Sequence, residues 1–196
     1  MTLDSNALIT LANLKTYLKI DDTSHDTQLE QLINSVSTLM LREIDRDLVY
    51  TTYTDEYLDG SGEEELYLPE WPIVEITSIT ENDISLTEGE EEDYTVYAAQ
   101  GYLRKVSGKW AAGRRNIKIT YKAGYWVASE VEGVDEMPKD LQLACMKQVG
   151  IEWKRAKAED WDQTSKTFPD GSISRNITNL HPQIEMVCRK YARMFP

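Results

Sequence analysis

The stretch HDTQLEQLINSVSTLMLREIDRD, residues 25–47, is the most regular part of the amino-acid sequence. Its apolar side chains recur every three or four positions: Leu29, Leu32, Ile33, Val36, Leu39 and Met40. This spacing places them on one stripe of an α-helix. Because most of the stability of such a helix comes from packing, the stripe must be buried against another element. The stretch predicts one amphipathic helix of a helical bundle.

Residues 8–22, LITLANLKTYLKIDD, precede that helix. Thr10 is a residue type that caps helices, and three leucines follow it at helical spacing: Leu11, Leu14 and Leu18. The polar residues 21–24 then interrupt the pattern. Residues 1–50 are therefore predicted to form an N-terminal helical hairpin.

The pattern changes in residues 51–124, where short β-prone runs alternate with turn residues. The expected strands are 53–58, 66–68, 73–79, 94–97, 102–106 and 116–121. We expect the first two to form a hairpin around Gly60-Ser61-Gly62 and the last two to pair across residues 108–113. Since short turns connect the strands, the segment is predicted to be an inserted antiparallel β-subdomain, either a small barrel or a sandwich.

Helical spacing returns after Pro138, a residue that suits the first turn of a helix. Residues 125–159 are predicted to supply a third helix that completes the bundle. Residues 160–196 are predicted to form a C-terminal arm, without clear periodicity up to residue 179, and a last helix that begins at Pro182. The expected fold class is α+β.

The charge of the chain is unevenly distributed. The formal net charge is −13, yet residues 51–100 contain fifteen Asp and Glu and no Lys or Arg, whereas residues 101–129 contain seven basic and no acidic residues. Such a reversal indicates either two oppositely charged faces of one domain or contacts between copies that close into a ring. The candidates for contacts between subunits are Glu63, Glu64, Glu65, Glu90, Glu91, Glu92, Arg104, Lys105, Arg114 and Arg115.

No motif of an enzyme active site is found in the sequence. His25 and His181 are far apart and neither has a cysteine at zinc-type spacing, and the acidic runs lack the ligand pattern of a calcium loop. We therefore expect no catalytic residues, no cofactor and no metal. No apolar run approaches the ~20 residues that span a bilayer, so no membrane association is expected. Cys145 and Cys188 are expected to be buried free thiols.

The segment LITLANLKTYLKIDD at residues 8–22, followed by the apolar stripe from Leu29 to Met40, resembles the gp6-like head-tail connector (adaptor) family of tailed bacteriophages. That family opens on a short L-x-x-L-K-x-Y-L helix, an acidic break and a longer amphipathic helix. Residues 137–144 and 182–193 resemble its third and last helices. The resemblance covers about half of the chain, and the β-subdomain departs from the small, nearly all-helical members of the family.

The resemblance implies a virion protein of the neck, made in the host cytoplasm. Such proteins form a ring, usually dodecameric, beneath the portal, where they extend the DNA channel and offer a platform to a stopper or tail protein. Double-stranded DNA would pass without sequence-specific binding. The acidic residues of 51–100 would face a neighbouring subunit, the tail side or the channel. By the same resemblance, the candidate portal contacts are Trp161, Phe168, Arg189, Tyr191, Arg193 and Phe195.

Three other functions are compatible with parts of the sequence. A tail completion or stopper protein would share a β-rich body and ring symmetry. An acidic decoy that mimics DNA and binds a host protein would account for the acidic block, but not for the seven basic residues that follow it or for the helices at both ends. An enzyme with paired carboxylates rests only on the abundance of acidic residues.

Overall fold

The computed structural model describes residues 2–158, 165–168, 171–174 and 180–193, with the backbone alone for 158, 165–168 and 171–174. Two compact units make up the chain. The helical unit consists of Met1–Asp45 and Pro138–Pro196, and the β unit consists of Arg46–Met137. The helical unit is thus assembled from two segments that are far apart in the sequence, and the β unit is inserted between them.

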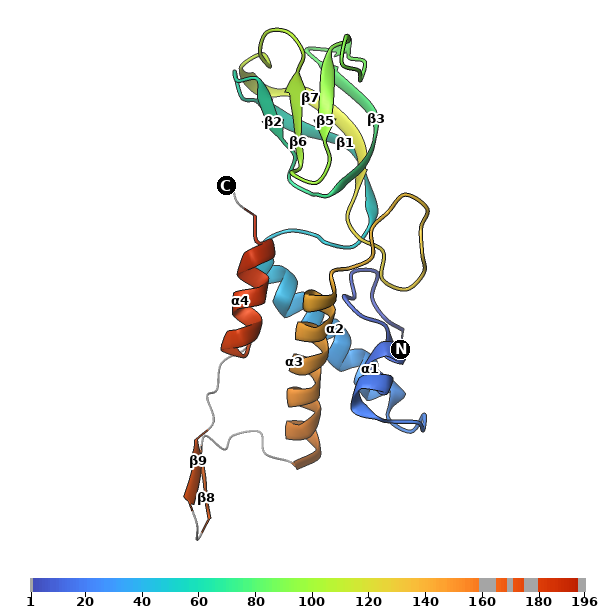
Figure 1. Cartoon of the computed structure of the whole chain (residues 1–196), viewed down its shortest axis with the longest axis vertical. Helices are drawn as coiled ribbons and strands as arrows, with labels where there is room; N and C mark the ends of the chain where they lie inside the picture. The colour runs from blue at the N-terminus through green and yellow to red at the C-terminus, as the bar shows by residue number, and fades with distance from the viewer. Residues whose placement is uncertain (1, 159–164, 169–170, 175–179, 194–196) are drawn as a thin grey trace. The chain divides into compact units, whose positions relative to one another are not determined.

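The helical unit contains α1 (Leu11–Leu18), α2 (Asp26–Ile44), α3 (Lys139–Ala158) and α4 (Pro182–Tyr191). Both α1 and α4 contact α2 and α3, which also contact each other, and Figure 1 shows α4 beside α2 and α3. The predicted caps form: the Thr10 side chain accepts a hydrogen bond from the Asn13 N–H at 3.1 Å, and Pro182 opens α4.

Buried side chains of the helical unit lie where the predicted periodicity places them. Leu29, Ile33, Val36 and Met40 of α2 are buried, whereas Leu32 and Leu39 at the edge of the same stripe are half-buried. Buried residues from the other helices are Leu14, Leu141, Cys145, Val149, Trp153, Ile184 and Cys188. The expected bundle helices are therefore present, each with an apolar face turned inward.

Two antiparallel sheets form the β unit. The four-stranded sheet has the order β1 (Thr51–Gly60), β7 (Gly113–Ala123), β3 (Ile73–Glu81) and β4 (Ile84–Ser85). The three-stranded sheet has the order β2 (Glu65–Tyr67), β6 (Tyr102–Lys105) and β5 (Tyr94–Tyr97). In the central strand β7, buried and less buried residues alternate. One apolar cluster takes buried residues from both sheets, among them Leu66, Tyr94 and Leu103 from one and Ile79, Ile119 and Tyr121 from the other.

Several predicted details of the β unit are wrong. No closed barrel forms from the described strands, because each sheet keeps its own edges. The first two strands do not form a hairpin: β1 pairs with β7 and β2 with β6. Strand β6 does not pair with β7, but with β2 and β5. The two-residue strand β4 was not expected, and within the predicted arm β8 (Ser165–Phe168) pairs with β9 (Gly171–Ser174).

Gly124 lies where the chain leaves the four-stranded sheet. Its φ of +106° is a conformation that only glycine adopts readily. A Cβ placed there would lie 2.8 Å from three backbone atoms of residues 48–50. Because these are backbone atoms, they cannot rotate away, so the end of β7 can pass residues 48–50 only with glycine at this position.

Candidate interaction surfaces

The described residues contain no cluster of three or more His, Cys, Asp or Glu side chains placed to hold a metal ion. Among the described helices, none combines the length and apolarity needed to cross a bilayer. Cys145 and Cys188 are both free and buried, as predicted. Burial raises the pKa of the Cys145 thiol to about 12 and that of Cys188 to about 11, which suppresses the reactive thiolate.

The C-terminal end of α4 is fixed to the start of α3 by Asp140. The Tyr191 hydroxyl donates to Asp140 Oδ1 at 2.7 Å, and the Lys190 ammonium lies 2.9 Å from Oδ2. Burial alone would raise the pKa of Asp140, but the bonds from Lys190 and Tyr191 outweigh it, and the pKa is lowered. The Arg193 N–H donates to the Ile44 carbonyl at 3.0 Å, so the chain after α4 is also bonded to the end of α2.

The outer face of α4 carries one exposed apolar side chain with basic neighbours. Met186 is 73% exposed, and Arg189 follows it three positions later, a spacing that keeps both on one side of the helix. The exposed Arg193 follows the end of α4. A face of this kind offers apolar contact together with charge. We refer to Met186, Arg189 and Arg193 as the α4 face.

The predicted portal contacts fall into three groups. Arg189 and Arg193 are exposed, whereas Tyr191 is partly buried and bonded to Asp140. For Phe168 only the backbone is described, in β8. Trp161 and Phe195 lie outside the described residues. The structure thus brings Arg189, Tyr191 and Arg193 together at one end of the bundle.

Five of the seven basic residues between 101 and 129 form ion pairs with the acidic block of the same chain. The pairs are Arg104–Glu64 (2.8 Å), Lys105–Glu81 (2.9 Å), Lys109–Glu63 (3.0 Å), Lys118–Asp55 (3.0 Å) and Lys122–Glu75 (2.7 Å). The hydrogen bond to each carboxylate partner is the largest of the effects that raise the pKa of Lys118 and of Lys122. Most of the basic residues between 101 and 129 therefore pair with acidic residues of their own β unit.

The other charged residues that were predicted to contact a neighbouring subunit form none of these ion pairs. Glu65 accepts a hydrogen bond from the Tyr67 hydroxyl at 2.7 Å, and the Arg115 guanidinium lies 4.7 Å from the centre of the Tyr57 ring. Arg114 is exposed, and so are Glu90, Glu91 and Glu92 in the loop between β4 and β5. Within the described part of the chain these four have no ion-pair partner. Contacts between copies through these residues stay a prediction.

Three tyrosines form a ladder across the three-stranded sheet. Tyr102 of β6 is the register partner of both Tyr67 and Tyr97, and its ring lies 5.3 Å and 4.5 Å from theirs. Tyr67 and Tyr97 are exposed. Because tyrosine offers apolar area with a polar edge, such a ladder is typical of protein interfaces. The ladder depends on a strand pairing that the sequence did not predict.

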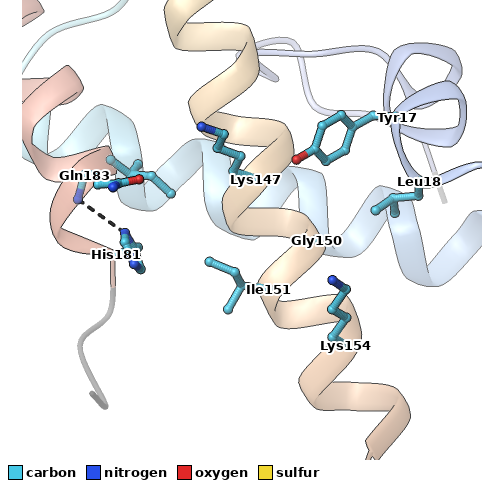
Figure 2. A pocket seen from close by; sticks show the side chains of 9 residues that line it. Tyr17, Leu18, Lys147, Gly150, Ile151, Lys154, His181 and Gln183 are labelled. Atoms are coloured by element: carbon cyan, nitrogen blue, oxygen red, sulfur yellow. Dashed lines mark hydrogen bonds between the residues drawn. The ribbon is translucent and has the colours of Figure 1, made fainter. Parts of the chain in front are cut away.

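A groove of about 260 Å³ lies over α3, between α1 and the start of α4, as Figure 2 shows. Leu18, Ile151 and Ile184 supply its apolar lining, and Gly150 lies between the two rim lysines, Lys147 and Lys154. A second, wider groove of about 550 Å³ lies between α2 and α3 and includes Gln28 and Trp153. Neither groove was predicted from the sequence, although the seven-residue spacing of Lys147 and Lys154 is visible there.

The sequence matches the family of head completion proteins over residues 7–194. The chain belongs to the head completion protein family. No curated protein matches it. Because the match takes in both units, the inserted β unit is part of the family's pattern, not an addition to it.

Solved structures similar to this head completion protein come from gene transfer agent (GTA) particles. They are a chain from the neck of an empty particle computed with C6 symmetry (TM-score 0.55, 12% identity), one from the native virion (0.54, 11%) and one from the native neck computed with C12 symmetry (0.52, 11%). Each match covers 100% of this chain and 94% of the other. At this identity the likeness establishes a shared fold.

The predicted resemblance to a family of phage head-tail proteins is confirmed at the level of the family, since the chain belongs to the head completion proteins. A structural family is consistent with the prediction that the chain is not an enzyme. The acidic decoy gains no support. Ring formation, subunit number, the partners and the passage of DNA are matters of proposal.

Proposed function

We propose that the chain assembles with identical copies into a ring under the portal, extends the DNA channel there and presents a platform to the stopper or tail. The family match over residues 7–194 carries the proposal. The GTA neck structures, which were computed with C6 and C12 symmetry, support a ring of six or twelve. The helical units would form the wall of that ring.

The α4 face is the best-supported portal contact. Its exposed Met186 and basic Arg189 and Arg193 can combine apolar burial with charge pairing, and Asp140 holds the helix in place through Tyr191. A helix that is already fixed loses less conformational freedom on binding than a free one. Trp161, Phe168 and Phe195 stay candidates for the same contact.

The negative charge of the β unit favours a protein that lets DNA pass rather than a protein that binds DNA sequence-specifically. Residues 46–137 contain 20 acidic and eight basic residues, a net charge of −12. Proteins that hold the phosphate backbone need a positive surface. Double-stranded DNA would therefore pass this unit without being retained, whether the acidic residues line the channel or face a neighbour.

Light scattering of the purified protein, alone and mixed with purified portal protein, tests the ring. The expected result is a ring-sized complex in the mixture. A chain that stays monomeric in the presence of its portal contradicts the proposal. A ring that binds the tail protein but never the portal would identify a stopper instead.

Charge reversal tests the α4 face. The proposed contact pairs Arg189 with acidic groups of the portal. Arg189→Glu should therefore weaken portal binding at least about tenfold, because it turns this attraction into repulsion. Lys19→Glu is the matched control, since Lys19 is an exposed basic residue of the same unit at the far end of α1. Equal affinity of the two variants, measured by titration against portal, would exclude the α4 face.

A further inference from the structure

The groove over α3 combines an apolar floor with a basic rim. Lys147 and Lys154 are seven residues apart and exposed, so both lie on the same side of α3, and Gly150 leaves the space between them without a side chain. Neither lysine has an ion-pair partner among the residues that the structure describes. His181 adds a third nitrogen-bearing side chain, whose Nδ1 accepts a hydrogen bond from the Gln183 N–H at 3.3 Å (Figure 2).

The size of the groove favours a protein side chain as the occupant. Its volume of about 260 Å³ is below the roughly 300–1,000 Å³ of small-molecule pockets. An aliphatic side chain could lie against Leu18, Ile151 and Ile184, while acidic neighbours reach the two lysines at the rim. The occupant should therefore be an exposed aliphatic residue on a projecting, acidic segment.

The β unit carries such a segment. Ile84 is 67% exposed, in the hairpin where Glu81 of β3 pairs with Ile84 of β4. Asp83 precedes it, and both turn residues, Asn82 and Asp83, have positive φ, which makes the turn tight. The loop that follows closes on itself, since the Thr87 N–H donates to Asp93 Oδ2 at 2.8 Å. That loop contains the exposed acidic residues Glu88, Glu90, Glu91 and Glu92.

We propose that the hairpin tip of one copy docks into the groove of the next, with Ile84 on the apolar floor and the acidic loop against Lys147 and Lys154. This inference rests on the proposed ring and assigns its subunit contact. Each copy offers a hairpin and a groove on different units, so the contact is head-to-tail and repeats around the ring. Of the acidic partners predicted from the sequence it keeps Glu90, Glu91 and Glu92. The lysines of α3 replace Arg104 and Lys105, which pair within their own chain.

Charge complementarity selects a second copy as the occupant. The helical unit contains 14 acidic and 13 basic residues and is nearly neutral, so the lysine rim is a local positive site on it. The β unit holds −12 of the chain's net charge of −13. A pairing of the two units from different copies lowers the repulsion that twelve acidic β units would otherwise exert on one another.

Disulfide trapping tests the contact in the ring-sized complex formed with portal protein. One stock carries Ile84→Cys and the other Ile151→Cys, so that an introduced pair can form only between copies. Oxidation of the mixed ring should give at least about tenfold more covalent dimer than a control mixture of Ile84→Cys and Gln28→Cys. Gln28 is an exposed residue at the other groove of the same unit. The native Cys145 and Cys188 are buried and should not contribute.

Charge exchange provides a second test. Lys147→Glu with Lys154→Glu gives a chain whose groove and loop are both acidic. Glu88→Lys, Glu90→Lys, Glu91→Lys and Glu92→Lys together give a chain whose groove and loop are both basic. Each should lose ring formation on its own by at least about tenfold. An equal mixture should recover it, because every groove then meets a loop of opposite charge in an alternating ring.

The outcomes of these experiments distinguish failure of the proposed subunit contact from failure of the proposed ring. If no ring forms with the wild-type chain, the proposed function fails. If the ring forms but both cysteine pairs give equal dimer, or the charge variants assemble alone as well as the wild type, the ring stands and the assigned contact is overturned.

Discussion

The helical unit and the β unit achieve stability in different ways. The helical unit joins two distant segments by apolar helix faces and carries a net charge of −1, whereas the β unit is one continuous segment of net charge −12, with five ion pairs around a two-sheet core. The comparison teaches that the ion pairs of the β unit form within that unit. Changes of backbone or charge in the β unit should act on that unit and leave the helices unaffected, and the reverse should also hold.

The largest effect is expected from Gly124→Ala. The new Cβ would meet three backbone atoms at 2.8 Å in a conformation that alanine avoids, so the β unit should lose at least about 4 kcal/mol. Urea unfolding followed by helical circular dichroism and by tryptophan fluorescence should show two separated transitions. Gly108→Ala is the control, since Gly108 also has positive φ but no atom near its missing Cβ, and it should cost about 1 kcal/mol. If Gly124→Ala lowers both transitions equally, the two units are not independent.

A smaller loss is expected when the most buried ion pair is broken. Lys105 and Glu81 have side chains only 9% and 14% exposed, and Lys105 also lies 4.7 Å from the centre of the Trp110 ring. Lys105→Ala should therefore cost the β unit about 3 kcal/mol, because Glu81 keeps a charge with its main partner gone. Lys109→Ala removes an exposed pair and should stay within about 0.5 kcal/mol. Similar unfolding midpoints for the two variants would contradict this ranking.

In the helical unit the corresponding test concerns Asp140. Its pKa is lowered on folding, so its carboxylate adds stability above about pH 4, and that contribution is lost as the pH falls through the lowered value. Tyr191→Phe should cost about 1 kcal/mol at pH 7 and progressively less in acid, where the hydroxyl no longer meets a carboxylate. Urea midpoints between pH 7 and pH 3 measure this. A cost that does not change with pH would show that Tyr191 acts only through its ring.

The smallest effect should be a gain. Gly150 is inside α3, and a Cβ there would lie 3.4 Å from Leu18 and 3.8 Å from Tyr17, which is ordinary van der Waals contact. Gly150→Ala should stabilise the helical unit by about 0.5–1 kcal/mol, since glycine lowers helix stability. The same substitution in the other unit, Gly124→Ala, has the opposite sign. Destabilisation by Gly150→Ala would mean that Leu18 and Tyr17 of α1 leave no room for the added methyl group.

The helices could be predicted closely because their signals are local. The apolar spacing in residues 25–47, Thr10 as a cap and Pro182 at a first turn each depend on neighbours in the sequence, and each is found as expected. The six expected strands also exist. Their partners were mispredicted, because alternation shows that a run is a strand but not which distant strand it meets.

The interaction surfaces were harder to predict, for the same reason. Arg104 and Lys105 were assigned to contacts between copies on charge alone, and the fold pairs them with Glu64 and Glu81 of their own chain. The basic residues that the structure leaves exposed beside an apolar groove, Lys147 and Lys154, come from the helical unit. Only the meeting of α1, α3 and α4 makes that groove, and no single segment encodes it.

The insertion of the β unit has a consequence for biosynthesis. During translation, α1 and α2 leave the ribosome more than 90 residues before α3, their main packing partner, whereas the whole β unit is complete before α3 begins. At about 5–20 residues per second, the nascent apolar stripe of α2 stays uncovered for several seconds at least. The inserted unit should thus become native first, and the N-terminal helices only after α3 has been synthesised.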